Sequence, residues 1–144
     1  LLPDDLIIKK NCSKSMISIN TKYNASVIAS MKVKKKDVSR WGIFNINKKI
    51  NSINFSISSV VEKPDVQNAP SNKAVIGRYI LPINIFDKLN TQKAGKDGEI
   101  HITDAIQSLI NDGEKFIAHN FSGKYLDCGS MTGFIKSSKE ISKI

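Results

Sequence analysis

Hydrophobic residues change their spacing from one segment of the chain to the next, and these changes predict helices that alternate with strands. In residues 12–23 they recur every three or four positions, for example at Met16 and Ile19, which is the period of one helix face. Asn11 or Ser13 can cap this helix with its side chain. Further helices are expected to open at Pro82, at Thr103 or Asp104, and at Met131, the last of them running to Ile144.

Strands are predicted where the apolar residues are continuous or alternate. Residues 25–33 form a nearly unbroken apolar run, as expected of a strand that is buried on both faces. In residues 53–61, Ile53, Phe55 and Ile57 alternate with polar residues, which predicts a half-exposed strand with these three side chains inward. The remaining strands are expected at 42–47, 74–81, 115–121 and 125–129, with Leu1 and Leu2 as the end of another.

Two helices in the second half of the chain have sequence signals at their ends. Pro82 can open the first helix because its missing N–H costs nothing in a first turn. The second helix is expected to stop at 111–113, where Asn-Asp-Gly follows the last periodic residue. Helices that alternate with strands predict an α/β fold with a mixed, mostly parallel sheet. In the helix that Pro82 opens, the residues expected to face inward are Ile85, Phe86 and Leu89.

Length and charge narrow the range of functions. The 144 residues suit a single domain, and 40% hydrophobic residues is ordinary for a globular protein. The net charge of +9 would suit a nucleic-acid partner, but the basic residues are nearly all lysine, and Arg40 and Arg78 are the two arginines. Lysine, isoleucine and asparagine share AT-rich codons and are all abundant, so codon composition accounts for the charge. We therefore expect no nucleic-acid partner.

The cysteines and the lack of long apolar runs bear on the compartment. Cys12 and Cys128 could form one long-range disulfide, but two free thiols in a reducing cytosol fit so sparse a pair better. No segment approaches the roughly 20 apolar residues that span a bilayer, and the sequence shows no secretion leader. A cytoplasmic location without a membrane partner is the expectation.

Polar clusters lie at the ends of several predicted strands. Ligands of α/β proteins bind in the loops where strands end, so these clusters are candidates for one site. Because proline restricts the residue before it, Lys63 is expected to be extended ahead of Pro64. The clusters are Asp4-Asp5, Arg40-Trp41-Gly42, Glu62-Lys63-Pro64 and Asp127-Cys128-Gly129.

Seven segments, in one order and at characteristic spacing, resemble a known family, the bacterial UTP–glucose-1-phosphate uridylyltransferases (UDP-glucose pyrophosphorylases). No single segment is specific, but together they extend over nearly the whole chain. They are Leu-Pro-Asp-Asp at 2–5, Ala-Ser-Val-Ile-Ala at 25–29, Asp-Val-Ser-Arg-Trp-Gly-Ile at 37–43, Val-Glu-Lys-Pro at 61–64, Ala-Pro-Ser-Asn-Lys-Ala-Val-Ile-Gly-Arg-Tyr-Ile-Leu at 69–81, Gly-Glu-Ile-His-Ile-Thr-Asp-Ala-Ile at 98–106 and Tyr-Leu-Asp-Cys-Gly at 125–129.

The resemblance implies a Rossmann-like nucleotidyltransferase fold and the reaction of UTP with glucose 1-phosphate to give UDP-glucose and pyrophosphate. In this family the glycine-rich phosphate loop and the uracil-reading loop precede the Leu-Pro-Asp motif, and the present sequence contains no such glycine-rich loop. Residues 1–144 are therefore expected to be the sugar-binding, C-terminal part of a single nucleotidyltransferase domain that is truncated at its N-terminus. On its own this part is expected to be inactive, and the intact family usually forms homo-oligomers.

The resemblance also implies a magnesium site. It places Asp4 as the principal metal ligand and, with Lys63, as a catalytic residue, whereas Asp5 is expected at the surface or behind the ligands. Asp127 is implied as a second ligand, although an aspartate there could equally cap the following helix. Mg²⁺ takes one or two carboxylates together with phosphate oxygens and water, which matches two aspartates.

Four positions are implied in binding glucose 1-phosphate. Glu62 would accept hydrogen bonds from sugar hydroxyls, and Lys63 would bind the phosphate as a point charge. Gly42 would bring its backbone close to the sugar. Thr103 would approach the sugar, unless it only caps its helix.

Some positions and alternatives remain open. Trp41 stands where the family often has tyrosine, and His101 replaces an expected glutamine and receives no role. His119 is interpreted as structural. The alternatives are a related enzyme such as a glucose-1-phosphate thymidylyltransferase, a non-catalytic remnant or binding module, and a basic nucleic-acid binder.

Overall fold

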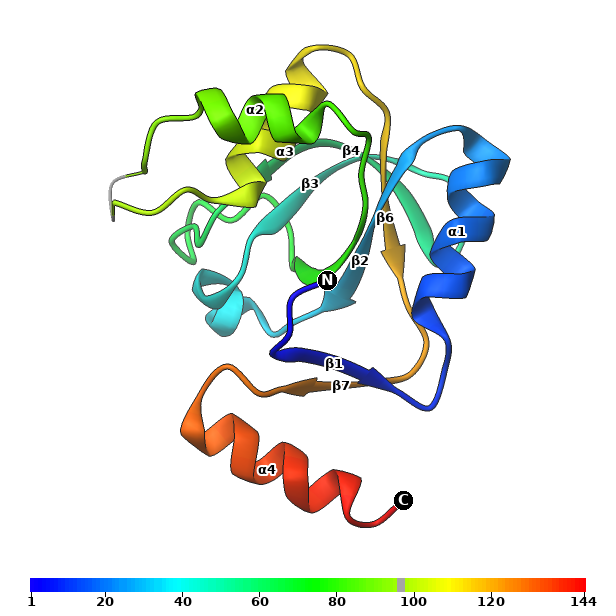
Figure 1. Ribbon diagram of the computed structural model, residues 1–144, viewed down its shortest axis with the longest axis vertical. Helices are drawn as coiled ribbons and strands as arrows, with labels where there is room; N and C mark the ends of the chain where they lie inside the picture. Colours follow the sequence, from blue (N-terminus) through cyan, green and yellow to red (C-terminus); the bar gives the residue numbers. More distant parts are fainter. Residues whose placement is uncertain (96–97) are drawn as a thin grey trace.

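The structure is a computed structural model that describes residues 1–95 and 98–144 (Figure 1). Helices and strands are interspersed along the chain, which confirms the α/β class. In chain order the elements are β1 (Asp5–Ile8), α1 (Cys12–Tyr23), β2 (Ser26–Lys32), the 3₁₀ helix η1 (Lys35–Arg40), β3 (Ile43–Lys49), β4 (Asn54–Val61), β5 (Lys73–Ile80), α2 (Ile85–Thr91), α3 (Ile102–Asn111), β6 (Phe116–Asn120), β7 (Lys124–Asp127) and α4 (Met131–Ile141).

Five strands pair side by side in a closed ring, in the order β2-β5-β3-β4-β6, and β1 pairs with β7 in a separate antiparallel ribbon. The sheet is mixed, as expected, but the prediction that it is mostly parallel is wrong for the described residues. There, β2 with β6 is the only parallel pair. One reason is local: β3 and β4 are joined by residues 50–53 alone, and so short a connection forces the two strands to run in opposite directions.

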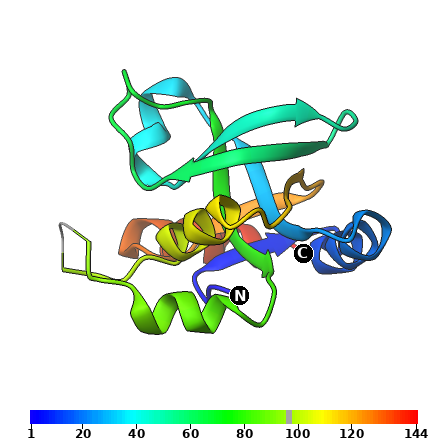
Figure 2. The same ribbon diagram turned by 90° about the horizontal axis from the view of Figure 1, so that it is seen from above.

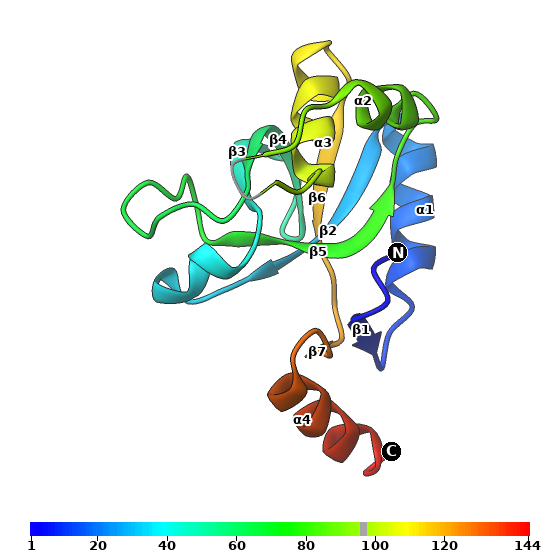
Figure 3. The ribbon, with the colours of Figure 1, turned by 60° about the vertical axis from the view of Figure 1, so that its left-hand side comes forward.

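Helices cover both faces of the central pair β2 and β6. Alternate residues of β2 face different clusters: Ile28 packs with the buried residues of α3, whereas Val27 and Ala29 pack with those of α1. This arrangement confirms that the apolar run of β2 is buried on both faces. In Figure 2, α3 lies between the β3–β4 hairpin and α2, and Figure 3 shows α1 across the sheet from α3.

The start of β4 does not follow the predicted alternation. Ile53 is 44% exposed, whereas Asn54 is buried. The side chain of Asn51 accepts hydrogen bonds from the backbone N–H groups of both residues, which makes Ile53 part of the turn. Asn54 is satisfied inside the protein by His119, since its Oδ1 lies 2.8 Å from the ring Nδ1. A histidine with this partner has the structural role that was predicted for it.

Several predicted ends of elements are also corrected. Leu1 and Leu2 do not end a strand: β1 begins at Asp5, and Leu2 makes one backbone hydrogen bond, to the carbonyl of Gly77. Pro82 precedes α2 in a turn rather than opening the helix, which starts at Ile85. Ile85 is buried and Leu89 packs on the core, but Phe86 is 60% exposed and does not face inward.

The start of α1 and the end of α3 agree with the sequence prediction. Asn11 caps α1, because its Oδ1 accepts from the N–H of Lys14 at 3.0 Å. The third helix stops at Asn111, and Gly113 follows with a φ of 92°.

The ribbon of β1 and β7 lies below the ring in Figure 1, and α4 packs against β7. Ser137 is the buried residue of α4, and its hydroxyl donates to the backbone carbonyl of Asp127 at 3.0 Å. Among the described residues, no helix has both the length and the apolar character needed to cross a membrane.

The burial of His119 predicts a pH-dependent stability. Burial lowers the pKa of its imidazole below the ordinary value of 6.5, so the folded chain resists a proton that the unfolded chain accepts. The free energy of unfolding should therefore fall as the pH decreases through about 6.5. Urea titrations between pH 7.5 and 5 measure this loss, and His119→Gln should show a shallower decline over the same range. Equal declines in the two proteins would contradict the assignment.

Candidate functional site

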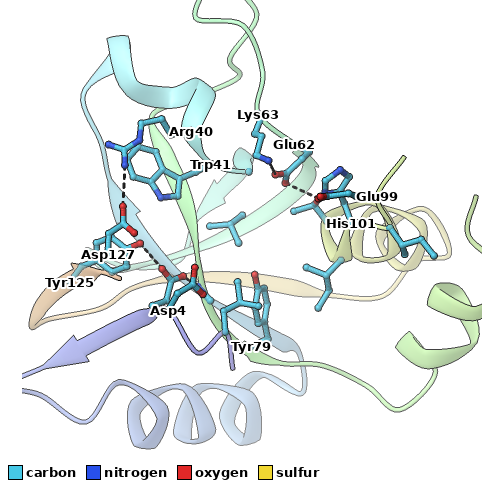
Figure 4. Close-up of a pocket in the computed structure, with 18 residues that line it drawn as sticks. Asp4, Arg40, Trp41, Glu62, Lys63, Tyr79, Glu99, His101, Tyr125 and Asp127 are labelled. Atoms are coloured by element: carbon cyan, nitrogen blue, oxygen red, sulfur yellow. Dashed lines mark hydrogen bonds and ion pairs between the residues drawn. The ribbon is translucent and has the colours of Figure 1, made fainter. Parts of the chain in front are cut away.

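A cavity of about 610 Å³ opens between the β1–β7 ribbon and the strand ring (Figure 4). It collects polar residues from segments that lie far apart in sequence. All six residues that were predicted for the site line it, namely Asp4, Gly42, Glu62, Lys63, Thr103 and Asp127. Each of the four strand-end clusters thus contributes at least one residue to the cavity, and the role of each residue remains a prediction.

Asp4 and Asp127 face the cavity from the side of the β1–β7 ribbon. Strand pairing sets Asp5 opposite Asp127, and the N–H of Cys128 donates to the backbone carbonyl of Asp4 at 2.8 Å. Both carboxylates lie against Gly129: a Cβ atom added there would be 2.6 Å from Asp4 Oδ2 and 3.4 Å from Asp127 Oδ1. A side chain at position 129 would press on the Asp4 carboxylate, the nearer of the two.

Both oxygens of the Asp127 carboxylate have partners. Oδ1 accepts from the N–H of Gly129 at 2.9 Å, and Oδ2 pairs with the guanidinium of Arg40 at 3.1 Å. The alternative role of Asp127 as a helix cap is wrong, because the hydroxyl of Ser130 caps α4 by accepting from the N–H of Gly133. Arg40 itself lies over the ring of Trp41, with Cζ 4.6 Å from the ring centroid.

Asp5 lies behind this pair rather than at the surface. It is buried, and its Oδ2 accepts from the N–H of Gly77 at 2.6 Å, while its Oδ1 accepts from the hydroxyl of Tyr125. Burial, and then the hydrogen bond to Asp5, raise the pKa of the Tyr125 hydroxyl. Burial also raises the pKa of Tyr79, with further contributions from the charges of Asp5, Glu62 and Asp4 in that order. Both tyrosines therefore remain neutral hydrogen-bond donors at physiological pH.

The opposite side of the cavity carries a second polar group, formed by Glu62, Lys63 and Thr103. The hydroxyl of Thr103 donates to Glu62 Oε2 at 2.9 Å, and Lys63 Nζ lies 4.0 Å from Glu62 Oε1. Thr103 lies inside the first turn of α3, after His101 at the N-cap position, and does not cap the helix. Neither Thr103 nor Asp104 is the cap, so the capping alternative is wrong and the hydroxyl is used to orient Glu62.

The backbone of Lys63 is not extended as Pro64 had suggested. Its φ is 40°, in the left-handed region that non-glycine residues seldom adopt. Its N–H donates to the carbonyl of Trp41 at 3.1 Å, and this bond holds the turn. Strained backbone of this kind clusters at active sites and at loops that bind ligands.

Gly42 is confined by its own neighbours. An added Cβ would lie 3.0 Å from Thr103 Cγ2 and 3.1 Å from both Glu62 Oε2 and Val75 Cγ2. Its carbonyl accepts from the N–H of Val75 at 2.8 Å, which ties the start of β3 to β5. A larger residue would therefore push against the very pair that faces the cavity.

Several residues of the cavity were not predicted for the site. Arg40 and Trp41 were recognised only as part of a strand-end cluster, and His101 received no role although it lines the cavity together with Glu99. Tyr79 and Tyr125 gave one usable signal, since each is a polar-tipped aromatic inside one of the seven segments of the family resemblance.

The donors at the ribbon end fit a magnesium ion. Carboxylate oxygens are the hard ligands that Mg²⁺ prefers, and an oxygen of Asp4 and one of Asp127 both lie near Gly129. Residues 1–95 and 98–144 contain no group of three or more His, Cys, Asp or Glu side chains that could hold a metal. Two carboxylates are nevertheless enough where the substrate's phosphate oxygens and water complete the coordination.

The burial of Asp5 predicts a difference between two adjacent aspartates. Asp5→Ala would leave the N–H of Gly77 and the hydroxyl of Tyr125 without their acceptor, at a cost of about 1–3 kcal/mol in the free energy of unfolding. Asp4→Ala is the matched control, because Asp4 is exposed and should change stability by less than about 0.5 kcal/mol. Urea unfolding of the two variants tests this, and similar losses would refute the assignment.

Comparison with known proteins gives several similar sequences. The chain is 36% identical to the UTP–glucose-1-phosphate uridylyltransferase of Pseudomonas aeruginosa, over 95% of this chain and 50% of the relative. It is 39% identical to the enzyme of that name from Streptococcus pyogenes, over 96% of this chain and 47% of the relative. The chain thus spans about half the length of the curated relatives that it matches.

Solved structures agree with the sequence matches. An apo UDP-glucose pyrophosphorylase superposes with a TM-score of 0.91 at 40% identity, over 99% of this chain and 53% of the other. A UDP-glucose pyrophosphorylase complexed with UDP-glucose gives 0.90 at the same identity, over 99% and 54%. A glucose-1-phosphate thymidylyltransferase from Bacillus anthracis is 22% identical with a TM-score of 0.74, over 98% and 52%, and shares the fold.

A family model matches the whole sequence. Its description is nucleotidyl transferase, and the match extends over residues 1–144. The chain therefore belongs to the nucleotidyl transferase family.

Proposed function

We propose that this chain supplies the sugar-phosphate side of a UTP–glucose-1-phosphate uridylyltransferase, which forms UDP-glucose and pyrophosphate from UTP and glucose 1-phosphate. The observation that carries the proposal is the convergence of the Glu62–Lys63 pair and the Asp4–Asp127 pair on one cavity. Relatives at 36–39% identity bear the name of this activity, and one at 40% identity was solved with UDP-glucose. The thymidylyltransferase alternative is less well supported, since that relative shares the fold at 22% identity.

In this proposal Glu62 binds the glucose ring. A carboxylate can accept hydrogen bonds from two neighbouring hydroxyls, and Thr103 holds one carboxylate oxygen in place at 2.9 Å. Gly42 keeps the space beside this pair open, because a Cβ there would press on Glu62 Oε2. The chain thus selects a polyhydroxylated substrate by a preoriented carboxylate.

Lys63 binds the phosphate of the sugar. Its side chain is 55% exposed at the cavity, and its ammonium can move from Glu62 to a phosphate without losing a close ion pair, because the present separation is 4.0 Å. The attack of the sugar phosphate on the α-phosphorus of UTP requires alignment and charge neutralisation rather than a protein nucleophile. His101 therefore receives no role as a base.

Asp4 and Asp127 would hold Mg²⁺ at the other end of the cavity. When bound, the ion would neutralise the phosphate charges that develop during the transfer. The chain's own contribution is to keep the two carboxylates on either side of Gly129, through the pairing of β1 with β7.

Further parts of the proposal concern organisation. We assign residues 1–144 to the sugar-binding, C-terminal part of a nucleotidyltransferase domain, and we place the protein in the cytoplasm as a homo-oligomer. Support for a reducing compartment comes from Cys12 and Cys128, which are both free, with Cys12 buried.

Binding of glucose 1-phosphate tests the sugar-phosphate assignment. Isothermal titration of the 144-residue chain should detect glucose 1-phosphate, and Lys63→Met should weaken it roughly tenfold or more, because a charge-assisted bond to the phosphate is lost. Glu62→Gln should weaken glucose 1-phosphate and unphosphorylated glucose alike. Lys36→Met is the control, since Lys36 is an exposed lysine that does not line the cavity. Equal effects of the Lys63 and Lys36 variants would rule out the assignment.

An activity assay tests whether this chain lacks the part that binds UTP. The 144 residues contain no glycine-rich phosphate loop, so UTP lacks its usual binding segment. A coupled assay for pyrophosphate release, with UTP, glucose 1-phosphate and Mg²⁺, should therefore show no activity above background for this chain alone. Robust turnover would show instead that these residues suffice for both substrates.

A further inference from the structure

Arg40 is a cation at the metal end of the cavity, and neither the family resemblance nor the proposed reaction assigns it a role. It ends the 3₁₀ helix η1 and reaches across to β7, where its guanidinium lies 3.1 Å from Asp127 Oδ2. The two residues are 87 positions apart, so the contact is set by the fold and not by local sequence. Figure 4 shows this pair on the same side of the cavity as Asp4, away from Glu62 and Lys63.

The charges around this pair explain why a cation is held there. Asp4 and Asp127 both have carboxylate oxygens near Gly129, and Asp5 pairs with Asp127 across the ribbon, so Arg40 meets an end of the cavity that is rich in acidic residues. In the part of the chain that the structure describes, Arg40 is the one basic side chain in ion-pair contact with Asp127. The ammonium of Lys63, by contrast, lies beside Glu62 at the sugar end.

We propose that Arg40 is a built-in competitor of the divalent metal: its guanidinium pairs with Asp127 and must leave when the ion binds. This inference rests on the proposed function for its metal ligands, Asp4 and Asp127. Each oxygen of Asp127 already has a partner, Gly129 N–H on Oδ1 and Arg40 on Oδ2, so an ion approaching the cavity side of Oδ2 meets the guanidinium.

The geometry makes the exchange easy. The side chain of Arg40 is 59% exposed and that of Asp127 is 31% exposed, so breaking their ion pair returns both groups to water. Arg40 also lies over Trp41, which can keep the released guanidinium beside the cavity by a cation–π contact. Arg40 is therefore a positioning residue that acts through Asp127.

The affinity for Mn²⁺ alone, without nucleotide or sugar, tests this inference. Electron paramagnetic resonance titrations of the 144-residue chain should show that Arg40→Gln binds Mn²⁺ about two- to fivefold more tightly than the wild type, the range expected for one exposed ion pair. Arg40→Lys keeps a competing charge and should stay close to the wild type. Lys36→Gln removes the same charge from the same 3₁₀ helix and should have little effect.

Two backgrounds separate this inference from the proposed function. In Asp127→Asn, the Arg40→Gln change should no longer alter Mn²⁺ affinity. If Asp4→Asn and Asp127→Asn both leave Mn²⁺ binding unchanged, the metal site of the proposed function fails. If they weaken it but Arg40→Gln equals the wild type or binds more weakly, the competition alone is overturned. An equal gain in Lys36→Gln, or no Mn²⁺ binding by either the wild type or Arg40→Gln, also overturns it.

Discussion

The carboxylate of Asp5 joins the β1–β7 ribbon to the five-stranded ring, and the shape of the cavity depends on that junction. One of its oxygens accepts from Gly77 in β5, and the other accepts from the Tyr125 hydroxyl in β7. The two strands of the ribbon pair only with each other in the described chain, so few other contacts fix their position against the ring. Because Asp4 precedes Asp5 directly, this buried residue sets the distance between the metal end and the sugar end.

Each end of the cavity has a carboxylate, but the two carboxylates differ in their hydrogen-bond and ion-pair partners. At the sugar end, the hydroxyl of Thr103 donates to one oxygen of Glu62, and Lys63 Nζ lies 4.0 Å from the other. This carboxylate is therefore oriented but can still accept hydrogen bonds from a ligand. At the ribbon end, backbone N–H and guanidinium groups occupy both oxygens of Asp127. A sugar needs a preoriented acceptor, whereas a metal ligand can be held by a cation that is later exchanged. The strained backbone of Lys63 belongs to the first arrangement.

The elements of this fold were largely predictable because they depend on local periodicity. The helix over 12–23 and the doubly covered strand of Val27, Ile28 and Ala29 need only the spacing of apolar residues. Contacts across 72 and 120 positions, such as those of Asp5, have no local pattern, and an aspartate after an aspartate looks like a solvated turn. The same limit explains why Ile53 is exposed and Asn54 is buried, the reverse of what the alternation predicted. The buried amide of Asn54 has a hydrogen-bond partner in His119, on a distant strand. The site residues were found by family resemblance, and their hydrogen-bond partners could only come from the fold.

The net charge of +9 gives a misleading picture of the site, because the excess of lysine lies elsewhere. Acidic side chains outnumber the lysine and arginine that line the cavity, although phosphates are the proposed ligands there. The acidic side chains are Asp4, Asp5, Glu62, Glu99 and Asp127, against Arg40 and Lys63. Such a cavity cannot accept further negative charge without added cations, since like charges in a partly buried space repel strongly. A divalent ion supplies two positive charges where one guanidinium supplies one, so replacing Arg40 by metal at Asp127 reduces the excess of negative charge that a phosphate meets at this end of the cavity.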